Sequence, residues 1–142
     1  MNATIGTIFG WVIVIAYAMT VMNYVIKFIN RKWGKTIRKN DKLKGPFQVV
    51  MSFIVKNHRI FGYITIIGIL VHFYIQYNRW GFVTGGVIAA VLMITQAGLG
   101  AYGAYIDKKR KGPWLVAHRI IAVLLLVAIV YHIYFVNLNY SF

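Results

Sequence analysis

Four apolar stretches, each near the length of a membrane-spanning helix, constrain this chain more than any other feature. A helix needs roughly 20 apolar residues to cross the hydrocarbon core of a bilayer. The stretches are continuous and lack the alternation of apolar and polar residues that barrel strands show. We therefore expect an all-α protein, a single transmembrane four-helix domain over residues 1–142. Its helices should cover about residues 3–31, 47–77, 82–107 and 113–138.

The composition excludes most soluble folds. Apolar residues make up 60% of the chain and charged residues 13%, against about 25% charged in ordinary soluble domains. The chain has no cysteine, which removes thiolate metal sites, iron–sulfur clusters and the covalent attachment of a c-type haem. The apolar stretches contain no carboxylate, so a proton relay of the pump kind is not supported. Any cofactor must be held by other side chains.

The net charge of +14 does not indicate a nucleic-acid-binding surface, because the cations gather in the connections between apolar stretches. Residues 31–46 hold seven basic residues and residues 107–112 hold four, whereas the connection between them has only Arg79. Short basic loops stay in the cytoplasm. This predicts a multi-pass cell-membrane protein with up-down-up-down topology, both termini extracytoplasmic and no cleaved signal peptide. The basic loops serve this topology and are candidates for docking an acidic partner.

The chain also repeats itself. The pattern His-Arg-Ile, eleven residues, then His-x-Tyr occurs at His58 and again at His118, an offset of 60. Upstream, a Lys-Gly-Pro segment ends at Pro46 and again at Pro113, where a helix amino terminus tolerates the missing N–H. The second and fourth helices are therefore expected to be two versions of one unit.

All four histidines lie in these two helices, 14 residues apart in each. Fourteen residues make nearly four turns, so both members of a pair face one way, about 21 Å apart along the helix axis. The second and fourth helices are diagonal partners in such a bundle. We therefore expect His58 to meet His118 at the cytoplasmic level and His72 to meet His132 at the outer level.

Two facing imidazoles at each level favour one kind of metal cofactor over others. Zinc takes three or four protein ligands, and the apolar stretches offer no Asp, Glu or Cys to complete such a set. Two opposed imidazoles are instead the axial ligands of a haem iron, noncovalent and b-type because cysteine is absent. Ligation by two histidines leaves no open position on the iron, which indicates electron transfer. The sequence thus predicts two b-type haems with His58, His118, His72 and His132 as metal ligands.

Basic and small residues near these histidines are candidates for haem contacts. We expect four cations to meet the haem propionates, with interfacial snorkelling as the alternative interpretation. These cations are Arg59, Arg119, Lys56 and Arg79. Small residues on the companion helices would leave room for a porphyrin, although they also suit plain helix contacts. They include Gly6, Gly10, Gly85, Gly86, Gly98, Gly100 and Gly103.

Through these four histidines, residues 47–138 resemble the haem-bearing four-helix core of the cytochrome b family of quinol-oxidising bc-type complexes. They are also similar to the ferric-reductase-like transmembrane family, which uses two histidine pairs on two helices. The resemblance implies stacked haems bound across the bundle. The chain shows no quinone-site motif of the first family and no flavin or nicotinamide domain of the second. We therefore expect electrons from a separate cytoplasmic flavoprotein or iron–sulfur protein at the basic loops, or from quinol.

Three functions fit these features. The first is an electron-transfer subunit of an oxidoreductase complex, carrying electrons across the membrane to an extracytoplasmic acceptor. The second is a stand-alone quinol-linked oxidoreductase that reduces ferric chelate or reacts with superoxide near Arg79, Tyr74 and Tyr134. The third is a haem-free membrane anchor whose histidines hydrogen-bond across the bundle. Haem analysis separates the third from the others, and quinol-dependent reduction by the isolated chain separates the second from the first.

Overall fold

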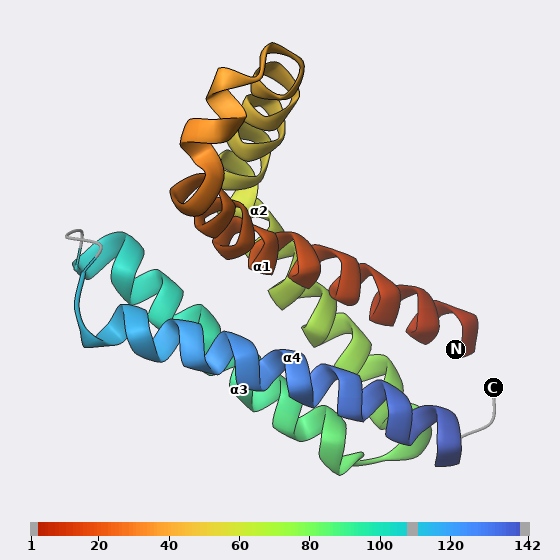
Figure 1. Cartoon of the computed structure of the whole chain (residues 1–142). Helices are drawn as coiled ribbons and strands as arrows, with labels where there is room; N and C mark the ends of the chain where they lie inside the picture. Colours follow the sequence, from red (N-terminus) through yellow and green to blue (C-terminus); the bar gives the residue numbers. More distant parts are fainter. Residues whose placement is uncertain (1–2, 108–110, 140–142) are drawn as a thin grey trace. The chain divides into compact units, whose positions relative to one another are not determined.

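The computed structural model describes residues 3–107 and 111–139, which are almost entirely helical (Figure 1). The elements are α1 (Ala3–Lys39), α2 (Asp41–Trp80), α3 (Thr84–Ala101), a π-helical turn η1 (Tyr102–Ile106) and α4 (Pro113–Asn139). In this described part, four helical segments are long and apolar enough to cross a membrane. The expectation of an all-α, multi-pass membrane protein is confirmed at this level.

The first two helices are much longer than predicted. Residues 31–46 are not a loop, because α1 continues to Lys39 and α2 begins at Asp41, with only Asn40 between them. Lysine and arginine are good helix formers, so the run of charge does not end the helix. Asn40 makes the turn by accepting, through its side-chain Oδ1, a hydrogen bond from the backbone N–H of Lys42 at 3.0 Å, as helix-capping residues do.

The two prolines occupy different structural positions. Pro113 is the first residue of α4, as predicted. Pro46 lies inside α2, five residues after its start at Asp41, so the prediction that it marks a helix amino terminus is wrong. Pro46 and its neighbours are exposed, which lets water satisfy the carbonyl that loses its helical partner. The Lys-Gly-Pro segments therefore are not equivalent parts of a repeat.

The chain divides into two compact units. One unit, Val12–Thr65, comprises most of α1 and the first part of α2. Its buried side chains include Ile13, Tyr17, Ile26 and Ile54. Many other large apolar side chains of this unit are exposed; Val49, for example, is 69% exposed. A surface of this kind is what hydrocarbon would cover.

The other unit combines Met1–Trp11 with Ile66–Phe142. In it, α3 and α4 pack antiparallel, since Gly85 of α3 lies beside His132 and Gly100 lies beside His118. Leu125 of α4 is fully buried, and Ala89 and Met93 of α3 and Ile129 of α4 are nearly so. This packing places His132 beside the first turns of α3 and His118 beside its last turns.

The helix ends of this unit are held by specific residues. Gly81 follows α2 with a φ of 70° and donates its N–H to the carbonyl of Tyr77 at 2.9 Å, a backbone conformation that favours glycine at the end of a helix. At the far end of α3, the indole N–H of Trp114 donates to Asp107 Oδ2 at 2.8 Å. The Trp114 ring lies against Gly103, where a Cβ would clash with it.

Candidate functional site at the histidines of α2 and α4

The structure brings His72 of α2 and His132 of α4 together. Both lie in the same unit, with ring centroids 6.4 Å apart and ring planes at 89°. Two imidazoles that share a metal ion each place a nitrogen about 2 Å from it, so their ring centres lie roughly 6 Å apart. The two rings are therefore close enough for both to reach one metal ion, at a separation that is also ordinary for two rings in edge contact.

The ring of His72 is fixed by the backbone of α1. Its Nδ1 donates to the carbonyl oxygen of Gly6 at 2.9 Å. This hydrogen bond leaves Nε2 as the nitrogen with a free lone pair, which is how metal-binding histidines are commonly oriented. The facing residue, His132, has a buried Nδ1 without a hydrogen-bond partner among the described residues. The pair thus offers two imidazoles close together in one unit, with the Nδ1 of His72 engaged by a backbone carbonyl.

Glycines make room for both rings. A Cβ on Gly10 of α1 would lie 3.3 Å from Cε1 of His72, and one on Gly86 of α3 would lie 3.1 Å from Cε1 of His132. Contacts this short are tighter than ordinary van der Waals packing, so a larger residue at either position would push against an imidazole. The prediction that small residues leave room for a porphyrin stays a prediction, and what the structure shows is that Gly10 and Gly86 lie against the two imidazole rings.

The other two histidines lie in different units. His58 belongs to Val12–Thr65 and His118 to the unit that contains α3 and α4, so the pairing of His58 with His118 stays a prediction. His118 is contacted by α3. The side-chain amide of Gln96 donates to its Nε2 at 3.1 Å, and a Cβ on Gly100 would lie 3.4 Å from its Cε1.

The four cations predicted to meet haem propionates are all exposed. They are Lys56, Arg59, Arg79 and Arg119. The guanidinium of Arg79 lies over the ring of Trp80, with its Cζ 4.6 Å from the ring centroid, an arrangement typical of cation–π contact. This position suits the interfacial interpretation as well as a propionate contact.

Two glutamines near the histidines were missed by the sequence reasoning. Gln96 contacts His118, as described above, and Gln76 lies beside Gly6, with its Oε1 buried and without a hydrogen-bond partner among the described residues. A signal for both was present, because a side-chain amide within an apolar span is costly to bury. Side-chain amides carry no charge, so a prediction that looks only for ionisable groups within apolar spans does not identify them.

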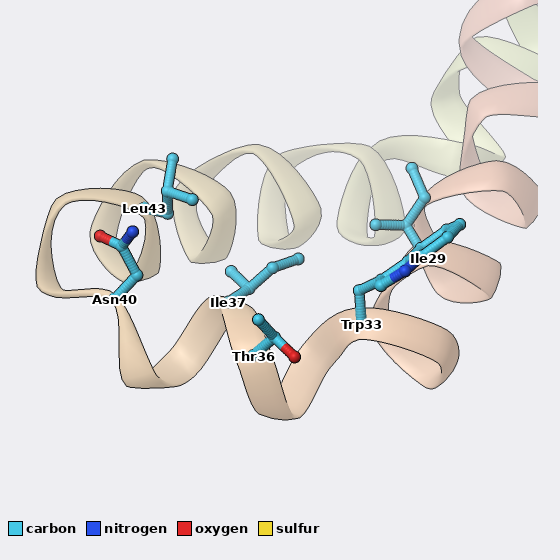
Figure 2. Close-up of a pocket in the computed structure, with 6 residues that line it drawn as sticks. All are labelled: Ile29, Trp33, Thr36, Ile37, Asn40 and Leu43. Carbon is cyan, nitrogen blue, oxygen red and sulfur yellow. The ribbon is translucent and has the colours of Figure 1, made fainter.

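The tip of the α1–α2 hairpin is a second notable surface. Its exposed cations are Lys27, Arg31, Lys32, Lys35, Arg38, Lys39, Lys42 and Lys44. Among them lies an open pocket of about 370 Å³, lined mainly by apolar side chains of α1 and by Leu43 of α2 (Figure 2). Figure 2 shows Trp33 and Ile37 along the α1 side of this pocket. The amine of Lys32 lies 4.6 Å from the centroid of the Trp33 ring.

Within residues 3–107 and 111–139, no three histidine or carboxylate side chains converge on a common point. A site built from this part of the chain would therefore rest on pairs of donors, as His72 and His132 provide. Comparison with family models, with curated proteins and with solved structures gave no match to the chain.

Proposed function

We propose that the chain is a di-haem b-type cytochrome of the cell membrane. In this proposal it carries electrons from a cytoplasmic redox protein or quinol to an extracytoplasmic acceptor, as a subunit of an oxidoreductase complex. The basic segments are cytoplasmic, both termini are extracytoplasmic and the four helices run up-down-up-down. The observation that carries the proposal is the facing of His72 and His132 at 6.4 Å.

The residues assigned to haem binding are the two histidine pairs. His72 and His132 hold the outer haem, and His58 and His118 hold the inner one. Each haem iron, held by one pair of histidines, would supply a reversible one-electron carrier. The protein's own part is to orient the imidazoles, as the Gly6 carbonyl does for His72, and to keep water from the site with apolar helices. Both tasks favour electron transfer over binding of a substrate at the iron.

The hairpin tip supports a protein donor on the cytoplasmic side. Residues 27–44 carry eight cations and one acid, Asp41. A pocket lined by Trp33, Ile37 and Leu43 lies among these charges. Protein interfaces often combine an apolar anchor in a pocket with a charged rim, and opposite charge speeds encounter. We therefore assign this surface to a donor protein with an acidic face and an exposed apolar side chain.

Haem analysis of the purified protein is the direct test. The pyridine haemochrome assay and reduced-minus-oxidised absorbance spectra are expected to give two b-type haems per chain. The variant His72→Ala/His132→Ala is expected to keep one haem, and His58→Ala/His118→Ala the other. A wild-type protein without haem, or two haems retained in the first variant, would overturn the proposal.

Electron transfer across the membrane needs its own measurement. The protein is reconstituted in liposomes that contain ferricyanide, and dithionite or a quinol is added outside. Reduction of the trapped ferricyanide is expected for the wild-type chain and is expected to be lost in His72→Ala/His132→Ala. Equal rates of ferricyanide reduction in liposomes with and without the protein would contradict the conduit, even if both haems are present.

A further inference from the structure

Gln96 is an unusual residue for its place in the fold. It is the one side-chain amide in α3, which otherwise consists of apolar and small residues with two threonines. Its Oε1 atom is buried and has no hydrogen-bond partner among the described residues. Thr95, its neighbour, satisfies its hydroxyl within the helix by donating to the carbonyl of Val91 at 2.9 Å. Gln96 is thus the polar group of α3 whose burial calls for an explanation.

The other end of the Gln96 amide reaches His118. Its Nε2 donates to Nε2 of His118 at 3.1 Å, which uses the lone pair of that ring nitrogen. The Nδ1 of His118 is buried and without a hydrogen-bond partner in the described part of the chain. His72 shows the reverse arrangement, with Nδ1 hydrogen-bonded to Gly6.

We infer that the side-chain amide of Gln96 competes with metal for Nε2 of His118. One lone pair cannot accept a hydrogen bond and bind iron at the same time, so the amide must turn away for that nitrogen to become a ligand. The inference rests on the proposed function, in which His118 is a haem ligand. Its consequence is that Gln96 lowers the haem affinity of the inner site and leaves the outer site unaffected.

The test measures haem binding at one site at a time. In the His72→Ala/His132→Ala background only the inner pair remains, and Gln96→Leu is expected to tighten haem binding there roughly tenfold, the effect of removing one competing hydrogen bond. In the His58→Ala/His118→Ala background the same substitution should change nothing. Gln76→Leu is the matched control, because it removes a similarly placed amide that lies beside Gly6 instead of His118. Unchanged or weaker haem binding in the inner-pair background would overturn the inference.

A second measurement does not depend on haem. In protein purified without haem and labelled with ¹⁵N-histidine, the resonances of His118 are identified by their loss in His118→Ala. Gln96→Leu, or Gln96→Met if the leucine variant does not fold, is expected to shift the Nε2 resonance of His118, and Gln76→Leu is not. An unmoved resonance would overturn the inference. If no background binds haem while the resonance moves, the contact stands and the proposed function fails.

Discussion

The two ends of α4 present their histidines in different ways. At one end, the ring of His132 faces His72, and the orientation of His72 is set by a backbone carbonyl of α1. At the other end, His118 is held by the side chain of Gln96 from α3. A helical carbonyl cannot swing away, whereas a glutamine side chain has several rotatable bonds. His72, in a His-x-Tyr segment, is therefore held by a rigid carbonyl, whereas His118, in a His-Arg-Ile segment, is held by a movable side chain.

The glycines of α3 beside the two α4 histidines also differ, in how closely each approaches the imidazole ring. A Cβ on Gly86 would lie 3.1 Å from the ring of His132, whereas one on Gly100 would lie 3.4 Å from the ring of His118. The first contact is tighter than normal packing and the second is ordinary. Interiors this closely packed respond to a single added methyl group. The comparison teaches that two histidines spaced to share one face of a helix do not have equivalent surroundings, because residues of the neighbouring helices differ at each end.

The largest expected effect comes from filling the space beside His132. In Gly86→Leu the added side chain must occupy the position of the imidazole ring, so under the proposed function we expect the variant to bind one haem where the wild-type chain binds two. The haem-to-protein ratio from pyridine haemochrome spectra measures this loss. Gly98→Leu on the same helix is the control, because a Cβ there meets nothing within 4 Å. Two haems retained in Gly86→Leu would show that the ring does not need this space.

A substitution by alanine compares the packing at the two α4 histidines directly. Gly86→Ala adds one methyl group at the tight contact and is expected to weaken haem binding at the His72–His132 pair about fivefold, an overpacking cost near 1 kcal/mol. Gly100→Ala adds the same group at the ordinary contact and is expected to leave the His118 site unchanged. Haem titration in the backgrounds with one histidine pair measures both affinities. Equal effects at the two positions would remove the proposed difference in packing.

Much of this arrangement follows from local sequence. The apolar runs predict the four helices, and Pro113 predicts the start of α4, because both depend on residues close together in the chain. The spacing of 14 residues between His58 and His72, and between His118 and His132, likewise predicts that the two histidines of each helix face one way. These inferences need only helical geometry and the length of a membrane span.

Other features depend on contacts between helices and so were not predictable. The continuation of α1 to Lys39 is an exception, a local feature that stays ambiguous because basic residues mark the end of a membrane span and also favour helix. The choice of Gly6 as the partner of His72, and of Gln96 as the partner of His118, depends on how α1 and α3 pack in the folded unit. No spacing in the sequence identifies such pairs.

The smallest expected effect lies at the His118 end of α3 and α4, where Trp114 donates to Asp107 at 2.8 Å. Trp114→Phe removes the indole N–H and, because its ring is shorter, also the contact of the distal indole atoms with Gly103. We expect it to lower the free energy of unfolding by about 1 kcal/mol, measured by denaturant titration in mixed micelles. Trp80→Phe, which changes a tryptophan under Arg79 at the end of α2, controls for the general effect of replacing an interfacial indole.

A double-mutant cycle isolates the hydrogen bond itself. Asp107→Asn alone also weakens the bond, because the acceptor loses its charge. If the two residues act together, the double variant Trp114→Phe/Asp107→Asn will be less destabilised than the sum of the single changes. Strictly additive losses would mean that the hydrogen bond between Trp114 and Asp107 contributes nothing of its own to stability.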